Sequence, residues 1–263
     1  MRKRRRDYSI ATMLEPTTAA LRAEGVVKRL GGQRVLEGVG LELAPRGALG
    51  LVGANGAGKT TFLRCALDLC APDAGRIEVF GVPSAEPRAR RRLAFVPERF
   101  APPYYLLGRE FLQLTLTLAG ARYDAGRARA LAAELELEPA ALERPARHLS
   151  KGMTQKLGLA ACLLQERDLY VLDEPMSGLD PASRVAVKSV LARLRASGRA
   201  LLFTSHVLAD VEQLCDEIVV LDRGAVRFSG SPGALRERFG GPDLERAFLN
   251  CIRSDVGSAT VHA

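Results

Sequence analysis

The chain alternates between short apolar runs and longer stretches in which apolar residues recur at helical spacing. A short continuous apolar run is typical of a strand buried on both faces, whereas helical spacing is typical of an amphipathic helix. Strands are therefore predicted at Gly40–Leu43, Ala48–Val52, Arg76–Phe80, Leu93–Val96, Leu169–Leu172, Ala200–Thr204 and Ile218–Leu221. Helices are predicted at Lys59–Leu69, Pro181–Ala196 and Val207–Leu214. This alternation predicts an α/β fold with a mainly parallel sheet covered on both faces.

The middle of the chain has a different pattern. From about residue 99 to 165 the periodicity is helical, in GREFLQLTLTLAG, in AGRARALAAELELEP and in the segment that follows them. We therefore expect an all-α subdomain at about 99–165, inserted into a single domain of residues 23–252. Its α/β core would comprise about 23–98 and 166–252. Near the end of the core, IVVLDRGAVRFSG predicts a hairpin with its turn at Arg-Gly.

Positive charge is concentrated at the start of the chain. The 263 residues include 38 Lys and Arg against 30 Asp and Glu, a formal charge of +8, and MRKRRRD alone holds five of the basic residues. No apolar segment follows, so neither a signal peptide nor a membrane anchor is expected. Residues 1–22 are predicted to be a basic, disordered tail, with attachment to anionic lipid as the alternative. Translation could start at Met1 or Met13, and residues 253–263 are expected to form a C-terminal tail.

Cysteine spacing and hydropathy argue against three classes of protein. The five cysteines are odd in number and lack C-x-x-C spacing, so neither a disulfide framework nor a zinc site is expected. No apolar run approaches the ~18 residues needed to span a bilayer. We therefore expect a soluble chain in a reducing cytoplasm.

A glycine-rich loop follows one of the predicted strands. GANGAGKT, at residues 53–60, matches G-x-x-x-x-G-K-[ST] and precedes a predicted helix, which is the context required of a Walker A loop. Glycines let successive backbone N–H groups turn toward one point, and the helix N-terminus adds its own. Lys59 adds a full positive charge, and the Thr60 hydroxyl is a hard oxygen suited to Mg²⁺. The alternative, an accidental glycine turn, is disfavoured by the flanking strand and helix.

Two carboxylates follow another predicted strand. In LYVLDEP, residues 169–175, Asp173 and Glu174 come directly after the apolar run, at the sheet edge where ligands of parallel α/β folds bind. One carboxylate can hold Mg²⁺ while its neighbour orients and deprotonates a water molecule. Taken alone, the pattern also fits an ordinary strand-to-helix cap. Together with the glycine loop, it indicates a nucleoside triphosphatase.

Four further motifs complete the pattern. They are VPE at 96–98, LSKGMTQ at 149–155, SGLDP at 177–181 and TSH at 204–206. In this order the six motifs resemble the Walker A loop, Q-loop, signature loop (usually L-S-G-G-Q), Walker B strand, D-loop and switch histidine of ATP-binding cassette (ABC) ATPases. The resemblance covers about residues 24–230.

The resemblance implies a P-loop NTPase core with an N-terminal antiparallel β portion and an all-α inserted subdomain. It assigns the triphosphate of ATP to Gly53, Ala54, Asn55, Gly56, Ala57, Gly58, Lys59, Thr60 and Thr61. It also assigns Mg²⁺ to Thr60 and Asp173, the general base to Glu174, and contact with the γ-phosphate to His206. Ser150 and Gly152 of the signature loop would complete the ATP site on the opposite subunit of a head-to-tail dimer, and Asp180 is assigned to the D-loop.

Four positions depart from the family pattern. Glu98 replaces the Q-loop glutamine; it can still ligate Mg²⁺ through oxygen, although a second negative charge near the γ-phosphate is unfavourable unless the metal offsets it. In the signature loop, Met153 replaces the final glutamine and Lys151 the first glycine. The lysine would either favour phosphate or extend into solvent. Leu30 stands where many relatives stack an aromatic ring on adenine, and leucine gives apolar contact without stacking.

The resemblance implies an ATP-hydrolysing subunit of a transporter, with its transmembrane permease on a separate chain. VPE with SKGM is similar to the ATPases of drug, polysaccharide and gliding-type exporters, so export is expected, from the inner face of the cell membrane. Tyr104, Tyr105, Leu106 and Leu107 would dock the permease, or the two leucines would pack inside the subdomain. The alternative is a soluble ABC ATPase acting on nucleic acid or ribosomes, which the short 99–165 insertion and the absence of aromatic-basic interleaving disfavour.

Overall fold

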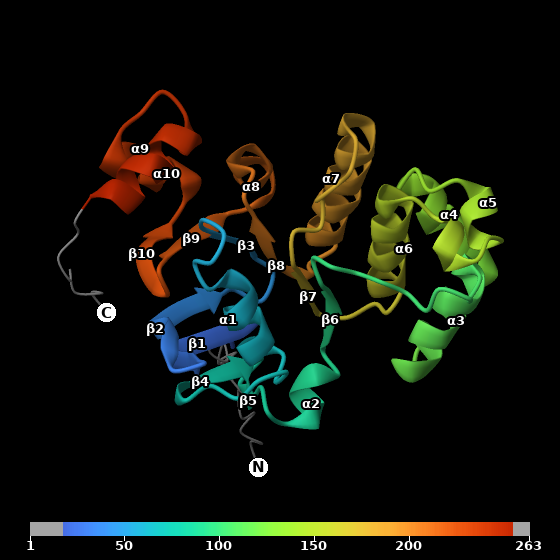
Figure 1. Cartoon of the computed structure of the whole chain (residues 1–263), viewed down its shortest axis with the longest axis horizontal. Helices are drawn as coiled ribbons and strands as arrows, with labels where there is room; N and C mark the ends of the chain where they lie inside the picture. Colours follow the sequence, from blue (N-terminus) through green and yellow to red (C-terminus); the bar gives the residue numbers. More distant parts are fainter. Residues whose placement is uncertain (1–17, 255–263) are drawn as a thin grey trace, which may run out of the picture.

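The computed structural model describes residues 18–254, so the first 17 residues, with both possible start methionines, and the last nine lie outside the described residues. Figure 1 shows a central sheet with a smaller sheet beside it, and an all-helical region at the opposite end of the molecule from the C-terminal helices. Among residues 18–254, no helix combines the length and the apolar character that crossing a bilayer requires.

The central sheet has the strand order β10-β9-β3-β8-β7-β6. Its strands are β3 (Ala48–Val52), β6 (Leu93–Val96), β7 (Leu169–Leu172), β8 (Ala200–Ser205), β9 (Glu217–Asp222) and β10 (Ala225–Gly230). The pairs within β9-β3-β8-β7-β6 are all parallel, and β10 pairs antiparallel with β9. The mainly parallel sheet and the late hairpin are therefore confirmed, with Arg223 and Gly224 at positive φ in its turn.

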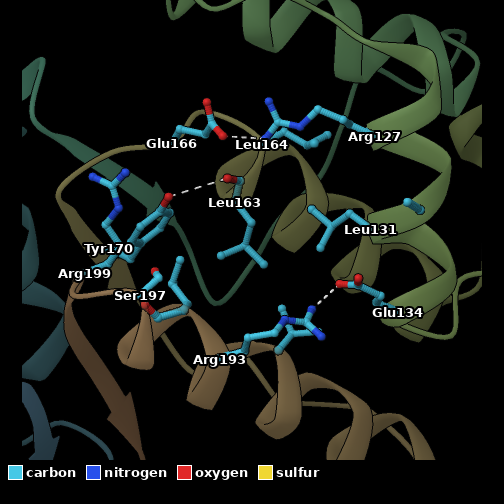
Figure 2. A pocket seen from close by; sticks show the side chains of 13 residues that line it. Arg127, Leu131, Glu134, Leu163, Leu164, Glu166, Tyr170, Arg193, Ser197 and Arg199 are labelled. Atoms are coloured by element: carbon cyan, nitrogen blue, oxygen red, sulfur yellow. Dashed lines mark hydrogen bonds and ion pairs between the residues drawn. The ribbon is translucent and has the colours of Figure 1, made fainter.

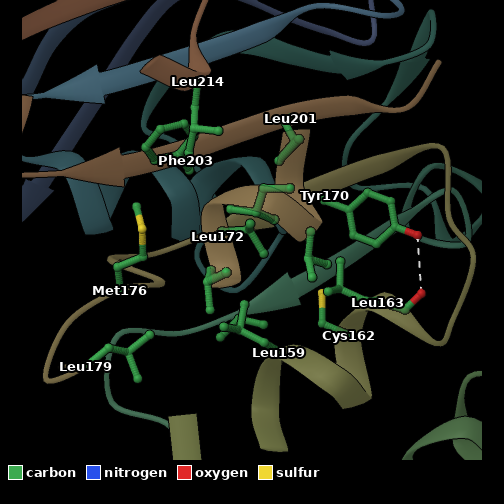
Figure 3. Packing of buried hydrophobic residues seen from close by; sticks show 14 of the residues in the cluster. Leu159, Cys162, Leu163, Tyr170, Leu172, Met176, Leu179, Leu201, Phe203 and Leu214 are labelled. Carbon is green, nitrogen blue, oxygen red and sulfur yellow. Dashed lines mark hydrogen bonds between the residues drawn. The ribbon is translucent and has the colours of Figure 1, made fainter. Parts of the chain in front are cut away.

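Apolar side chains cover both faces of this sheet, because each strand points alternate residues to opposite sides. In β8, Leu201 and Phe203 pack in a cluster with residues of the helices α7 (Pro181–Ala196) and α8 (Leu208–Leu214). Figure 3 shows part of that cluster, including Leu201, Phe203 and Leu214. Leu202, between them, belongs to a second cluster with α1 (Lys59–Ala66). This double coverage explains the uninterrupted apolar runs of the sequence.

The second sheet is antiparallel, in the order β2-β1-β4-β5. Its strands are β1 (Leu21–Leu30), β2 (Gln33–Leu43), β4 (Ala74–Val79) and β5 (Val82–Pro83). The expected tail of residues 1–22 therefore extends too far, since β1 begins at Leu21. The apolar pattern missed β1 and most of β2 because the register between them shifts after Ala23, around Gly25 at φ 59°, and a bulge of this kind breaks the alternation.

Helix α1 ends earlier than the apolar pattern predicts, at Ala66 and not at Leu69. Asp68 adopts a left-handed φ of 56°, and the Leu69 N–H donates to the Arg64 carbonyl over 2.9 Å. This is the hydrogen bond of a Schellman motif, which turns the chain out of the helix. The remaining helices of the core are α2 (Pro87–Arg90), α9 (Pro232–Phe239) and α10 (Leu244–Arg253).

The helical region, called here the helical subdomain, follows β6 in the chain. It contains α3 (Gly108–Leu118), α4 (Ala125–Glu134), α5 (Pro139–Leu142), a short 3-10 helix (Ala146–His148) and α6 (Lys151–Leu163). Side chains cap two of these helices: Asp124 accepts the Arg127 N–H, and Ser150 accepts the Met153 N–H. Leu106 is partly buried against the core, so it packs within the subdomain.

Candidate functional site

The glycine loop between β3 and α1 has a backbone that side chains would disrupt. A Cβ on Gly53 would come within 2.3 Å of the Leu221 carbonyl oxygen, and Gly58 has φ 110° with the Val35 carbonyl 2.9 Å from such a Cβ. At Gly56, with φ 82°, a Cβ would meet nothing within 4 Å, so this part of the loop borders open space. The residues therefore fit a cradle in which backbone N–H groups face a bound anion.

Lys59 folds back over this loop. Its side chain is buried, and Nζ donates hydrogen bonds to the carbonyl oxygens of Gly53 (2.6 Å) and Ala54 (3.3 Å). Burial lowers the pKa of Lys59, while the nearby carboxylates of Glu174, Asp173 and Glu98 oppose that shift. The ammonium group is thus held beside the loop, between its carbonyls and the carboxylates of the sheet edge.

Asp173 follows β7 and lies beside the start of α1. Its Oδ2 accepts a hydrogen bond from Thr60 Oγ1 over 3.1 Å, and its Oδ1 accepts one from Thr204 Oγ1 over 2.7 Å. A buried carboxylate and a hydroxyl at this separation are the hard oxygen donors that Mg²⁺ prefers. The donor set therefore fits the predicted magnesium ion.

Glu174, the next residue, has a left-handed φ of 48°. Its backbone N–H donates to Thr204 Oγ1 over 2.9 Å, and its side-chain Oε2 lies 2.8 Å from Nδ1 of His206. The Glu174 side chain is 10% exposed, whereas that of His206 is 61% exposed. A non-glycine residue at positive φ is strained, and such strain collects at functional sites. The geometry aims a buried carboxylate, oriented by a histidine, toward the same space as the glycine loop.

These groups share one hollow of about 620 Å³. Its lining comprises Val35, Ala54, Asn55, Gly56, Ala57, Gly58, Lys59, Thr60, Thr61, Glu98, Arg99, Asp173, Glu174 and His206. Chain segments far apart in sequence are therefore brought together at the carboxyl edge of the parallel strands, where the ligands of such folds bind. Leu30, which is 45% exposed, is not among the lining residues.

Ser150, Gly152 and Asp180 lie elsewhere in this chain and do not line the hollow. Ser150 and Asp180 are the N-caps of α6 and α7. Lys151 is exposed, and its methylene groups lie against Gly178 of the D-loop segment, since a Cβ on that glycine would approach Lys151 Cε to 2.9 Å. The structure therefore separates the predicted residues into the hollow and a second group formed by the signature loop and the D-loop.

Three residues of the site have no role predicted from the sequence. Thr204 bonds to both Asp173 and Glu174, while Val35 and Arg99 line the hollow. The available signal for Thr204 was its place in TSH, at the end of a strand adjacent to β7. Val35 and Arg99 carry no comparable pattern.

A second hollow, of about 480 Å³, lies between the helical subdomain and α7 (Figure 2). Leu131 and Glu134 of α4 face Arg193 of α7 across it. Ion pairs join Arg193 to Glu134 and Arg127 to Glu166. None of the residues predicted to bind phosphate lines this hollow.

The chain is similar to known ABC proteins in sequence. A family model described as "ABC transporter" matches residues 36–177. The Nod factor export ATP-binding protein I of Burkholderia orbicola is 38% identical over 237 residues, which cover 87% of this chain and 76% of that protein.

The chain is also similar to solved structures of ABC proteins. One titled "Structure of ATP binding subunit of ABC transporter" is 31% identical, with a TM-score of 0.79, and the match covers 89% of this chain and all of that one. A dimeric ATP-binding cassette bound to ADP and Pi, at 21% identity and a TM-score of 0.74, shares the fold over 80% of this chain and 98% of its own. Taken with the six motifs and the geometry of the hollow, these matches lead to one conclusion: the chain belongs to the ATP-binding ATPase family of ABC transporters.

Proposed function

We propose that this chain binds and hydrolyses ATP to drive export through a transmembrane permease on a separate chain. One observation carries the proposal: Lys59 and Thr60 of the glycine loop, Asp173 and Glu174 after β7, and His206 after β8 converge from three segments of the chain on one hollow. The export direction is supported by the similarity to a Nod factor export protein.

In the proposed mechanism, the chain's own groups bind the triphosphate first. The N–H groups of residues 54–61 and the Lys59 ammonium neutralise its charge at the N-terminus of α1. Thr60 and Asp173 hold Mg²⁺, and Glu98 at the rim is a further candidate ligand. When bound, Mg²⁺ neutralises charge that develops on the phosphate oxygens.

Glu174 then acts as the general base. Its carboxylate accepts the proton of the attacking water at a side-chain oxygen, while His206 Nδ1 fixes the carboxylate through the 2.8 Å contact to Oε2. Thr204 orients the backbone at Glu174 and the side chain of Asp173 from the neighbouring strand. Positioning and electrostatic stabilisation supply most of the catalysis in phosphoryl transfer, and both depend on these fixed contacts.

We propose further that two chains close head to tail, with Ser150, Gly152 and Asp180 of each completing the ATP site of the other. Support comes from their location outside the hollow of their own chain, and from the dimeric arrangement of a solved cassette with the same fold. Ser150 at the N-cap of α6 offers a second helix N-terminus for phosphate.

The permease would dock on the helical subdomain and hold the chain at the inner face of the membrane. Tyr104 and Tyr105 are 67% and 62% exposed and lie edge to face with their centroids 5.4 Å apart, and Leu118 on α3 is exposed as well. Exposed aromatic side chains of this kind are enriched at protein interfaces.

Replacement of Lys59 tests the proposal. Lys59→Ala should abolish Mg²⁺-dependent ATP binding and hydrolysis, because no other ammonium group lines the hollow within residues 18–254. Arg88→Ala, which removes an exposed arginine paired with Glu86, serves as the matched control and should behave like the parent. Unchanged turnover in Lys59→Ala would contradict the phosphate-binding role.

A further inference from the structure

One face of α6 lies along the segment that follows Glu174. Gln155 Nε2 donates to the Pro175 carbonyl over 3.2 Å, and a Cβ on Gly152 would lie 3.5 Å from the Gly178 carbonyl oxygen. Residues three and four positions apart share a helix face. The first two turns of α6, called here the signature helix because it begins in the signature loop, therefore face the D-loop segment of the same chain.

Lys156, on the second turn, is buried at this contact. It is 8% exposed, and its Nζ donates to Ser183 Oγ (3.1 Å) on α7 and to the Glu136 carbonyl oxygen (2.7 Å) at the end of α4. Both of these acceptors are uncharged oxygens, a hydroxyl and a backbone carbonyl, and neither is a carboxylate. A lysine is seldom buried without a carboxylate partner, because removing the charge from water costs free energy. A specific role for this buried ammonium group is therefore expected.

Ser183, which accepts the hydrogen bond of Lys156, is itself hydrogen-bonded to Asp180 of the D-loop. Its Oγ donates to Asp180 Oδ2 over 2.7 Å, and its backbone N–H donates to Asp180 Oδ1 over 3.0 Å. The hydroxyl proton of Ser183 is thus directed at Asp180, which leaves the oxygen to accept from Lys156. The N–H and hydroxyl of Ser183, with a smaller effect of Lys156, lower the pKa of Asp180. A cation and a carboxylate are therefore linked through one hydroxyl.

The other bond of Lys156 stays within the helical subdomain, where it reaches the end of α4. Glu136 follows α4 at a left-handed φ of 54°, and its carbonyl lies at the end of that helix. This position is beside the negative end of the helix dipole, which attracts cations. One buried ammonium group therefore joins α4, the signature helix α6 and the N-terminus of α7.

We propose that Lys156 is a positioning residue for ATP hydrolysis: it fixes the signature loop and the D-loop of one chain as a single unit, which closes on the ATP of the opposite subunit. The inference rests on the proposed head-to-tail dimer. Ser150 and Asp180 begin the two helices that Lys156 connects. Without this link, each loop would have to be ordered separately when the dimer closes, and the closed state would be less populated.

Steady-state kinetics of the full chain test this role. Lys156→Met keeps the length of the side chain and removes the donors, and should lower kcat on the order of tenfold, as expected for losing a charged hydrogen bond. The Kd of a non-hydrolysable ATP analogue at the glycine loop should stay within about twofold of the parent, because that loop is made by other residues. Lys156→Arg, which restores donors, should recover most of kcat.

Two further variants sharpen the test. Ser183→Ala breaks the link to Asp180 while leaving Lys156 and Glu136 in place, so it should lower kcat by a similar factor. If Lys156→Met does not fold, Ser183→Ala still tests the proposal. Lys28→Met is the matched control: Lys28 also donates to a backbone carbonyl, that of Ala71 at 2.7 Å, but on the antiparallel sheet, and it should keep the parental kcat.

Dimer formation separates this inference from the proposed function. In a Glu174→Gln background, ATP-induced dimers should form at a higher ATP concentration when Lys156→Met is added. If Glu174→Gln alone never dimerises with ATP, the head-to-tail proposal is wrong and this inference falls with it. If it dimerises, and folded Lys156→Met or Ser183→Ala protein dimerises and hydrolyses like its parent, the role of Lys156 is refuted while the dimer stands. A fall in activity that Lys156→Arg does not reverse would also refute it.

Discussion

The buried hydroxyl of Thr204, at the end of β8, donates a 2.7 Å hydrogen bond to Oδ1 of Asp173, beyond the end of β7. The same oxygen accepts the backbone N–H of Glu174 over 2.9 Å. One side chain from a neighbouring strand thus fixes both carboxylate residues of the site, since Asp173 is oriented through its side chain and Glu174 through its backbone.

Thr204→Val should therefore impair hydrolysis more than ATP binding. The variant keeps the shape of the side chain but leaves a buried N–H and a buried carboxylate oxygen without this partner, at a cost of ~1–3 kcal/mol in unfolding free energy. We expect kcat to fall clearly while nucleotide affinity changes little, as measured by steady-state rates, calorimetry and denaturant unfolding. Thr117→Val is the control, because Thr117 lies exposed on α3 and bonds only its own helix. Equal effects of the two substitutions would rule out the bridging role.

Glu174→Gln should bind ATP and fail to turn it over. Glutamine keeps a similar size and a carbonyl oxygen near His206 but cannot accept the proton of water at neutral pH. We expect an ATP-dependent dimer that persists, measured by gel filtration and light scattering with Mg²⁺-ATP. Rapid hydrolysis by this variant would remove Glu174 as the base and shift attention to another carboxylate at the rim, Glu98.

Asp210 should contribute to stability without touching nucleotide. It is buried on α8 and forms ion pairs with Arg184 and Lys188 of α7, so it ties the helix after His206 to the helix after the D-loop. Asp210→Asn leaves both cations without a counter-charge, and because they are partly exposed we expect a loss of about 2 kcal/mol in unfolding free energy. Glu42→Gln, which breaks an exposed pair with Arg22, should cost about 0.5 kcal/mol or less. If the two variants unfold at the same denaturant concentration, the ion pairs of buried Asp210 contribute no more to the unfolding free energy than the exposed Arg22–Glu42 pair does.

Thiol alkylation should distinguish Cys70 from the other four cysteines. Cys70 is half-buried, whereas the rest are buried, and burial raises the pKa of Cys65 to about 12 and that of Cys251 to about 11. Burial also raises the pKa values of Cys162 and Cys215. Because the thiolate is the nucleophile, iodoacetamide at about pH 8 should add one adduct to the native chain, at Cys70.

As the pH rises toward 11, the thiolate fraction of Cys251 should grow and its labelling should follow, with Cys65 later. Peptide mass mapping across this pH range provides the measurement. Cys70→Ser should remove the fast adduct and leave the slow ones. Labelling of Cys65 as fast as Cys70 in folded protein at about pH 8 would show that the thiol is not protected by burial.

The core chemistry of the site could be predicted from sequence because it depends on residue type and spacing within short segments. Phosphate binding needs glycines and a lysine at fixed positions before a helix, so Gly53–Thr60 reveals the loop by itself. Asp173 and Glu174 are equally visible after an apolar strand. The parallel sheet was predicted for the same reason, since burial on both faces gives apolar runs.

What the sequence hid depends on contacts between distant segments. Thr204 acquires its role only when β8 lies beside β7, and no local pattern states that pairing. Strand β1 was not predicted because a bulge near Gly25 interrupts its alternation of apolar and polar residues. The bond from Lys156 to Ser183 joins residues 27 positions apart, and from sequence alone Lys156 reads as one more solvated lysine on a helix.

The ion pairs across the second hollow join α4 to the core only weakly. Arg193–Glu134 and Arg127–Glu166 stand in water, with every side chain more than two-fifths exposed. Each such pair contributes no more than about 1 kcal/mol, little above thermal energy, and added salt weakens it further. The contact between the helical subdomain and the core is therefore easily deformed on this side. Raising the ionic strength should weaken the ion pairs, whereas it should not weaken the apolar packing beside them.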